Sequence, residues 1–188
     1  MKIRKSIIVT LLVVSCGSVM AANTADNMAE ARGVIKQFAK SLMGQLQPAM
    51  KSGGPVKAIQ VCNISAPGIS VETSNSSGWK VARTSLKLRN QDNAPDAWEL
   101  KVLNEFEARK AAGEDPKKID HSEVVETAGK KTFRYMKAIP TAELCLACHG
   151  SKIKPEVAKK LDALYPDDQA RGFKAGDIRG VFTLSKQL

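Results

Sequence analysis

The segment Cys145-Leu146-Ala147-Cys148-His149 places two cysteines and a histidine within five residues. Two thiols separated by two residues can each form a thioether with one vinyl group of a haem, and the adjacent histidine can then ligate the iron. The sequence contains this pattern once. It therefore predicts one covalently bound haem c, attached through Cys145 and Cys148, with His149 as an axial ligand. The fold must place this segment where a porphyrin can be enclosed.

The residues alone leave three other interpretations of these cysteines open. Together with His149, the three cysteines after residue 21 would just supply four zinc ligands, although neighbours such as Cys148 and His149 rarely reach one tetrahedral ion. A thioredoxin-like dithiol requires a parallel β-α-β context, which the surrounding sequence does not predict. A plain disulfide would leave one thiol unpaired. Covalent haem is the interpretation that the pattern favours.

The N-terminal residues are typical of an export signal. Basic residues precede an apolar run over residues 7–14, and small residues end at Ala21, as at a signal peptidase site. The run is shorter than the roughly 20 residues that span a bilayer. We expect a signal peptide over residues 1–21, a single domain over residues 22–188 and a periplasmic location. Ser15-Cys16 leaves open lipidation of Cys16, and we expect a membrane anchor only in that case.

The formal net charge of +10 is spread along the chain. Lysines and arginines alternate with acidic residues and do not form a basic stripe with aromatic residues, so nucleic-acid binding is not expected. The pattern is typical of a solvated surface. It also allows an acidic redox or signalling protein as partner, whose identity the sequence does not give. The oligomeric state is not predicted either.

Helical spacing of apolar residues predicts a long amphipathic helix from about Thr24 to Met50. Gly53-Gly54 should break this helix. Pro55 should then open a second helix that carries Cys62 and that ends or bends at Ala66-Pro67. The long helix is the largest single element that we expect.

Alternating patterns predict β-structure in the remainder of the chain. We expect a strand over residues 79–88, a hairpin over residues 123–139 with Phe133 and Tyr135 on one face, and a last strand over residues 181–185. Helices are expected after residue 95 and from about residue 155. Helices followed by strands with helical insertions make the fold class α+β.

Five short motifs are spread in order along the chain. They are Ala58-Ile59-Gln60-Val61-Cys62 with Ala66-Pro67; Arg83 with Ser85; Arg89-Asn90 with Asn93, Asp96, Trp98 and Glu99; Phe133-Arg134-Tyr135 with Cys145–His149; and Tyr165-Pro166-Asp167-Asp168 with Gly176-Asp177-Ile178-Arg179-Gly180. Together they resemble a bacterial family of exported single-haem c-type cytochrome domains, which occur alone or as input domains of membrane-bound sensors. The resemblance covers nearly all of residues 22–188. Gln91 departs from it, since the family pattern has proline there.

The resemblance implies a PAS-like antiparallel sheet with a long N-terminal helix and additional helices, with haem between helices and sheet. From the residues alone, the second axial ligand stays open among His121, the methionines and Cys62. The resemblance implies Cys62 beside His149, and a thiolate ligand would favour ferric iron and lower the reduction potential. Arg83 and Arg134 are candidates for binding haem propionates, because a guanidinium group suits a carboxylate.

These features predict a periplasmic monohaem cytochrome that serves as a redox sensor module or an electron-transfer protein. We do not expect an enzyme, because the sequence offers no acid–base group for catalysis beyond His121. The alternative is sensing or handling of a gas or small ligand at an open or exchangeable sixth iron site.

Overall fold

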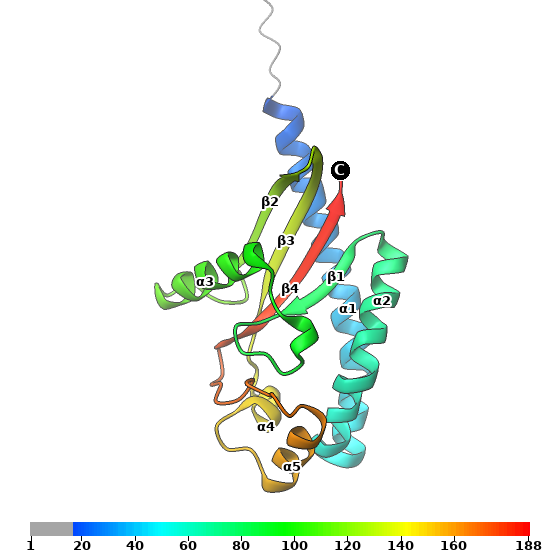
Figure 1. The fold of residues 1–188 in the computed structure, drawn as a ribbon, viewed down its shortest axis with the longest axis vertical. Coiled ribbons are helices and arrows are strands. Elements are labelled where there is room, and N and C mark those ends of the chain that lie inside the picture. The colour runs from blue at the N-terminus through cyan, green and yellow to red at the C-terminus, as the bar shows by residue number, and fades with distance from the viewer. Residues whose placement is uncertain (1–16) are drawn as a thin grey trace, which may run out of the picture.

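The computed structural model describes residues 17–188, and Figure 1 shows their fold. The helices are α1 (Gly17–Gln60), α2 (Ala66–Ser77), α3 (Ala97–Ala111), α4 (Leu146–His149) and α5 (Pro155–Leu164), with a π-helix at Val61–Ser65 and 3-10 turns at Gln91–Asn93 and Glu143–Cys145. The strands are β1 (Lys80–Thr84), β2 (Asp120–Thr127), β3 (Lys130–Pro140) and β4 (Ile178–Gln187). Cys16 and most of the predicted signal peptide lie outside the described residues. No helix in the described part of the chain is long and apolar enough to cross a membrane.

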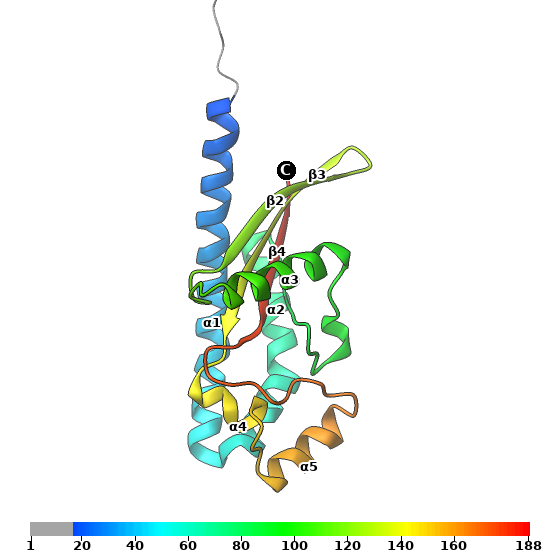
Figure 2. The same ribbon diagram turned by 90° about the vertical axis from the view of Figure 1, so that its left-hand side faces the viewer.

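The four strands form one antiparallel sheet in the order β1-β4-β3-β2. Helices α1 and α2 pack on one face of the sheet and α3 packs on the other (Figures 1 and 2). Alternation along β3 sends Phe133 and Tyr135 into the first core and Met136 into the second. The predicted α+β class, with its antiparallel sheet and long N-terminal helix, is confirmed.

Helix α1 follows the predicted amphipathic pattern. Ala31, Val34, Ile35 and Phe38 recur at helical spacing and are buried against the sheet. The predicted break also occurs, because Gly53 and Gly54 leave the helical conformation, with φ of −154° and 63°. The positive φ favours glycine at position 54.

Of the two outcomes predicted at Ala66-Pro67, an end or a bend of the helix, the end is wrong. The helical path does not end there, since the π-helix at Val61–Ser65 runs directly into α2. A proline in the first turn of a helix lacks only an N–H that would have no intrahelical partner. Pro67 therefore begins α2, which returns alongside α1 (Figure 2).

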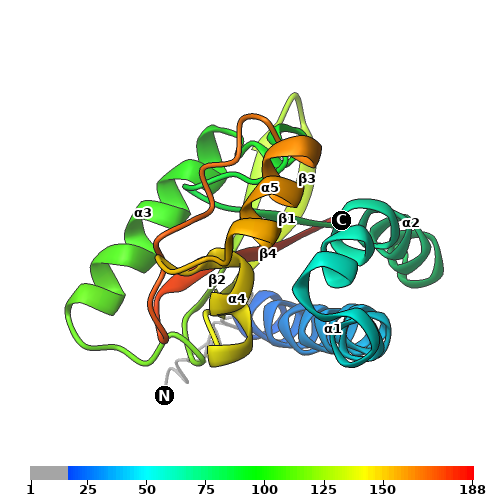
Figure 3. The same ribbon diagram turned by 90° about the horizontal axis from the view of Figure 1, so that it is seen from below.

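Strands β2 and β3 form the predicted hairpin. Ala128 and Gly129 make its two-residue turn with φ of 51° and 75°, the sign that such turns require. Beyond β3, the chain leaves the sheet and forms α4 and α5 beside the end of α1 (Figure 3). A small core of Ile59, Val157, Leu161 and Tyr165 joins α1 to α5, and Cys148 packs against it. This end of the molecule gathers the residues that the sequence analysis singled out.

Candidate functional site

The Cys145–His149 segment is short and firmly terminated. Cys145 ends a 3-10 turn, and α4 then carries Cys148 and His149. At Gly150, a Cβ atom would lie 2.6 Å from the Leu146 carbonyl oxygen, so only glycine lets the chain leave α4 this closely. Cys145 and Cys148 are half-buried free thiols, three residues apart on one side of a helical turn.

The fold brings Cys62 to these thiols although it is distant in sequence. Cys62 lies in the π-helix, a kind of irregularity that often occurs at functional sites. Burial raises the pKa of its thiol above the ordinary value. The charges of three arginines oppose this shift, with Arg83 first among them, and Cys145 adds to it. Cys62 is thus within electrostatic reach of both the Cys145–His149 segment and a group of cations.

His149 is held in one protonation state. Its Nδ1 lies 2.8 Å from the Ala170 carbonyl oxygen. A carbonyl only accepts hydrogen bonds, so Nδ1 carries the hydrogen and Nε2 carries the lone pair. Burial, followed by the charges of Arg179 and Arg89, lowers the pKa of His149 to about 3. A neutral imidazole with Nδ1–H held by a carbonyl group and a lone pair on Nε2 is the usual arrangement of a metal-ligating histidine.

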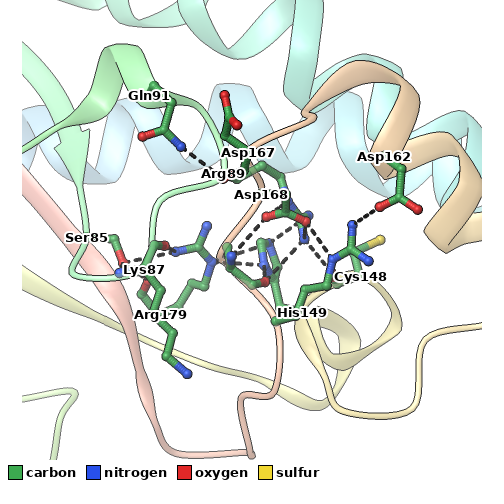
Figure 4. A network of polar contacts seen from close by, with 12 residues as sticks. Ser85, Lys87, Arg89, Gln91, Cys148, His149, Asp162, Asp167, Asp168 and Arg179 are labelled. Carbon is green, nitrogen blue, oxygen red and sulfur yellow. Dashed lines mark hydrogen bonds and ion pairs between the residues drawn. The ribbon is translucent and has the colours of Figure 1, made fainter.

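Arg89 and Asp168 form a buried ion pair next to this imidazole (Figure 4). The Arg89 guanidinium group donates to both Asp168 carboxylate oxygens, at 3.1 and 3.2 Å. It also donates to the carbonyl oxygens of Cys148, at 2.5 Å, and of Ala170, at 3.2 Å. Burial alone would raise the pKa of Asp168, but hydrogen bonds from Arg89 and Arg171 outweigh it and lower this pKa. The pair is therefore ionised at neutral pH.

Arg179 reaches the site because β4 is irregular there. The register pairs Ile139 with Gly180 and Pro140 with Ile178, so Arg179 has no residue opposite it. Such a β-bulge redirects a side chain. The Arg179 Nε atom lies 3.0 Å from Nδ1 and 3.4 Å from Nε2 of His149 (Figure 4). Nδ1 cannot both donate to Ala170 and accept from Arg179. Nε2 lies 3.4 Å from Arg179 Nε and 3.4 Å from Arg89 Nη1, which can only donate, so Nε2 is the nitrogen that accepts.

The site holds more positive than negative charge. Arg83, Arg89 and Arg179 act on Cys62 together, and burial with mutual repulsion lowers the pKa of Arg179 to about 10. Between residues 24 and 188, where side chains are described, Arg89 pairs with Asp168, whereas Arg83 and Arg179 form no ion pair. Arg83 and Arg179 are half-buried, and a cation that loses water without gaining a partner is destabilising. The site therefore suits an anionic group.

Arg134 lies elsewhere. It pairs with Asp96 at 2.7 Å and Glu99 at 3.2 Å, both at the start of α3, and its guanidinium group lies 4.1 Å from the centre of the Trp98 ring. These contacts are on the α3 face of the sheet. The structure thus brings together Cys62, Cys145, Cys148, His149 and Arg83, but it does not bring Arg134 to them.

Two other candidate iron ligands, His121 and Met136, also lie apart from this cluster. His121 is on β2, near Glu105 and Glu123, and Met136 is fully buried in the core under α3. In residues 17–188, no group of three or more histidine, cysteine, aspartate or glutamate side chains is arranged to hold a metal ion. Sequence reasoning gave no role to Asp168 or Arg179, although both lie in the last of the five motifs.

Comparisons with known proteins agree with the geometry. A family model described as Tll0287-like matches residues 18–186. A crystal structure of the cyanobacterial heme protein Tll0287 superimposes with a TM-score of 0.66 at 24% sequence identity, covering 86% of this chain and 95% of that chain. At this identity the match shows a shared fold. No curated protein matches the chain.

Proposed function

Because this chain belongs to the Tll0287-like family, we propose that it is a monohaem c-type cytochrome that transfers electrons or senses redox state. Haem would be attached through Cys145 and Cys148, with His149 and Cys62 as axial ligands. The observation that carries the proposal is the geometry at His149, whose Nδ1 lies 2.8 Å from the Ala170 carbonyl oxygen while Nε2 faces the donors of Arg89 and Arg179 and so keeps its lone pair. The fold match to a protein described as a heme protein supports it.

The described residues fit a haem in ligands and in charge. A haem iron takes four ligands from the porphyrin and needs only two from the protein, which His149 Nε2 and the Cys62 thiol can provide. A haem also carries two propionates. Arg83 and Arg179, which form no ion pair among the described residues, match the two propionates in number. The propionates would therefore neutralise the surplus positive charge. In this proposal Arg179 takes the role that the sequence analysis gave to Arg134.

The bound haem would supply one-electron chemistry, and the protein would set its potential. A thiolate ligand favours the ferric state and lowers the reduction potential. The chain's own residues bind and orient the group, and we propose no substrate chemistry for them. A periplasmic location and an acidic redox or signalling partner protein are part of the same proposal.

One observation favours the alternative of an exchangeable sixth site. Burial raises the pKa of the Cys62 thiol, and a protonated thiol is a weaker ligand than a thiolate. A gas or small molecule would then compete with Cys62 for the iron. The two functions differ in whether Cys62 stays bound.

Optical and electron spin resonance spectra of the matured protein in both redox states test the proposal. We expect a covalently bound haem and a six-coordinate low-spin ferric spectrum with thiolate character. Cys62→Ala should keep the covalent haem, lose the thiolate signature and raise the potential. Cys145→Ala is the matched control, because it removes one thioether and leaves the thiolate signature. A high-spin wild-type spectrum would favour the exchangeable site, and a wild-type protein without covalent haem would refute the proposal.

A further inference from the structure

Two segments of the sequence motifs have no role in the proposed function, and they meet beside His149. Arg89-Asn90 follows β1, and Tyr165–Asp168 follows α5. The side chains of Arg89 and Asp168 join these segments in a buried pair (Figure 4). Their exposed side-chain fractions are 9% and 1%, so the pair is shielded from water on nearly all sides. Burial of two charges costs free energy, and the contacts that the pair makes are what compensate for it.

The Arg89 guanidinium group links the pair to two backbone carbonyl groups beside the His149 imidazole. It donates to the carbonyl oxygen of Cys148, the residue before His149, and to that of Ala170. Asp168 in turn accepts a hydrogen bond from the Ala170 backbone N–H at 2.9 Å. Ala170 is thus held at both its N–H and its carbonyl group by one ion pair.

The Ala170 carbonyl oxygen is the acceptor for the His149 Nδ1–H. We propose that the Arg89–Asp168 ion pair positions His149, by holding Ala170 and Cys148 so that Nδ1 is the protonated nitrogen and Nε2 is directed into the site. Arg89 also acts directly, because its Nη1 atom lies 3.4 Å from His149 Nε2 and can only donate to it, so both contacts favour the same tautomer and make Arg89 and Asp168 positioning residues. The tautomer is a property of the chain itself, whereas the role of Nε2 as an iron ligand rests on the proposed function.

The geometry requires arginine at position 89. Its planar fork of donors serves the Asp168 carboxylate and two carbonyl oxygens at once, which the single ammonium group of lysine cannot reproduce. Arg171 provides a contrast, because it bonds the same Asp168 at 2.9 Å and also bonds Asp162. Its polar side-chain contacts are those two carboxylates, and its side chain is 31% exposed.

The first experiment measures the His149 tautomer in the haem-free full chain by nitrogen-15 nuclear magnetic resonance. In the wild type, we expect only the Nδ1–H tautomer. Arg89→Gln and Asp168→Asn should lose this preference and show a mixture with the Nε2–H form. Arg171→Gln is the matched control, because it removes the same charge from the same carboxylate and should keep the wild-type spectrum. His121, the second histidine of the chain, should be unchanged in every variant.

Arg89→Lys covers the case in which Arg89→Gln does not fold. It keeps the charge but not the fork, so we expect partial loss of the Nδ1–H tautomer in a chain whose circular dichroism matches the wild type. A single Nδ1–H tautomer in both Arg89→Lys and Asp168→Asn would overturn the proposal. A wild-type chain with the Nε2–H tautomer would do so as well.

The second experiment uses the haem-loaded protein. The orientation of the ligating imidazole affects the low-spin ferric g values, so a looser His149 should give shifted or multiple sets in Arg89→Gln and Asp168→Asn and one set in Arg171→Gln. Loss of such a supporting group elsewhere weakens metal binding by about 10–100-fold, and we expect His149 to be displaced by cyanide that much more readily. Unchanged g values and displacement would overturn the positioning role. If the wild type takes up no haem, the proposed function fails, while the tautomer measurement still decides the inference.

Discussion

Replacing Gly180 by alanine should push apart the two strands that hold Arg179 in place. Gly180 has an ordinary backbone conformation, so alanine is not strained by its φ angle. The obstacle is steric, because a Cβ atom there would lie 2.5 Å from the Thr84 carbonyl oxygen and 3.1 Å from the Ser85 Cβ atom. The first distance is roughly 1 Å shorter than an ordinary carbon–oxygen contact.

The cost follows from what must move. The Thr84 carbonyl oxygen belongs to the backbone, so the end of β1 has to shift relative to β4, whose last pair with β1 is Thr84 with Val181. Overpacking of this kind costs about 1–3 kcal/mol. For a chain of this length, that corresponds to a fall of about 2–12 °C in Tm. Ser85 would move too, and its hydroxyl group donates to the Arg179 carbonyl oxygen at 2.8 Å and accepts from the Arg179 side chain at 3.2 Å.

Thermal unfolding followed by circular dichroism measures the effect. Gly33→Ala is the matched control, because Gly33 is exposed inside α1 and a Cβ there has nothing within 4 Å. Alanine in a helix interior is favoured by about 0.5–1 kcal/mol over glycine, so Tm should rise by about 1–4 °C. If Gly180→Ala melts within about 1 °C of the wild type, the close approach of β1 and β4 is not what fixes this part of the site.

Three further predictions concern other charged side chains. Burial alone would raise the pKa of Asp120, but hydrogen bonds from Tyr135 and Arg32 lower it below 3.8, so the ionised carboxylate stabilises the fold above that value and this stabilisation is lost as pH falls through the lower folded pKa. Asp120→Asn should lower the free energy of unfolding by about 1–3 kcal/mol at neutral pH, measured by urea unfolding. An equal loss at neutral pH and below pH 3 would contradict this. Arg179→Gln should weaken uptake of haemin by the haem-free chain but not uptake of haemin dimethyl ester, which has no free propionates. If Arg134→Gln instead weakens uptake of haemin alone, Arg134 is the residue that binds a propionate. Asp96→Ala removes a capping box at the start of α3 and should cost about 0.5–2 kcal/mol, with unchanged thermal unfolding as the contrary result.

The elements that sequence patterns predicted best are those with strong local signals. Gly53-Gly54 breaks α1, α3 begins after residue 95, and the hairpin places Phe133 and Tyr135 on one face, as expected. Pro67 was misread, because proline both ends helices and begins them, and the choice depends on the backbone before it. A π-helix has no clear sequence signature, since it adds one residue to a turn without changing the residue types. Its presence at Cys62 therefore emerged only in three dimensions.

The candidate site was predictable where it depends on spacing and unpredictable where it depends on register. Cys145, Cys148 and His149 follow from one short motif. Arg179 reaches His149 only because one residue of β4 is unpaired, and a single-residue slip exchanges the two faces of a strand. Arg134 shows the converse, since regular alternation places it on the α3 face beside Asp96. No local pattern distinguishes these two arginines.

The strand order has a consequence for the sequence of events in folding. Strand β4 is the last strand of the chain, yet it lies between β1 and β3 and pairs with both. The β2–β3 hairpin can form early, but β1 has no neighbour until residues 178–187 arrive, and such non-local pairings are slow to close. Removal of these residues would leave β1 with no strand beside it. Cys145 and Cys148 precede β4 in the chain, so their thiols should remain accessible to chemical modification until that final strand is inserted.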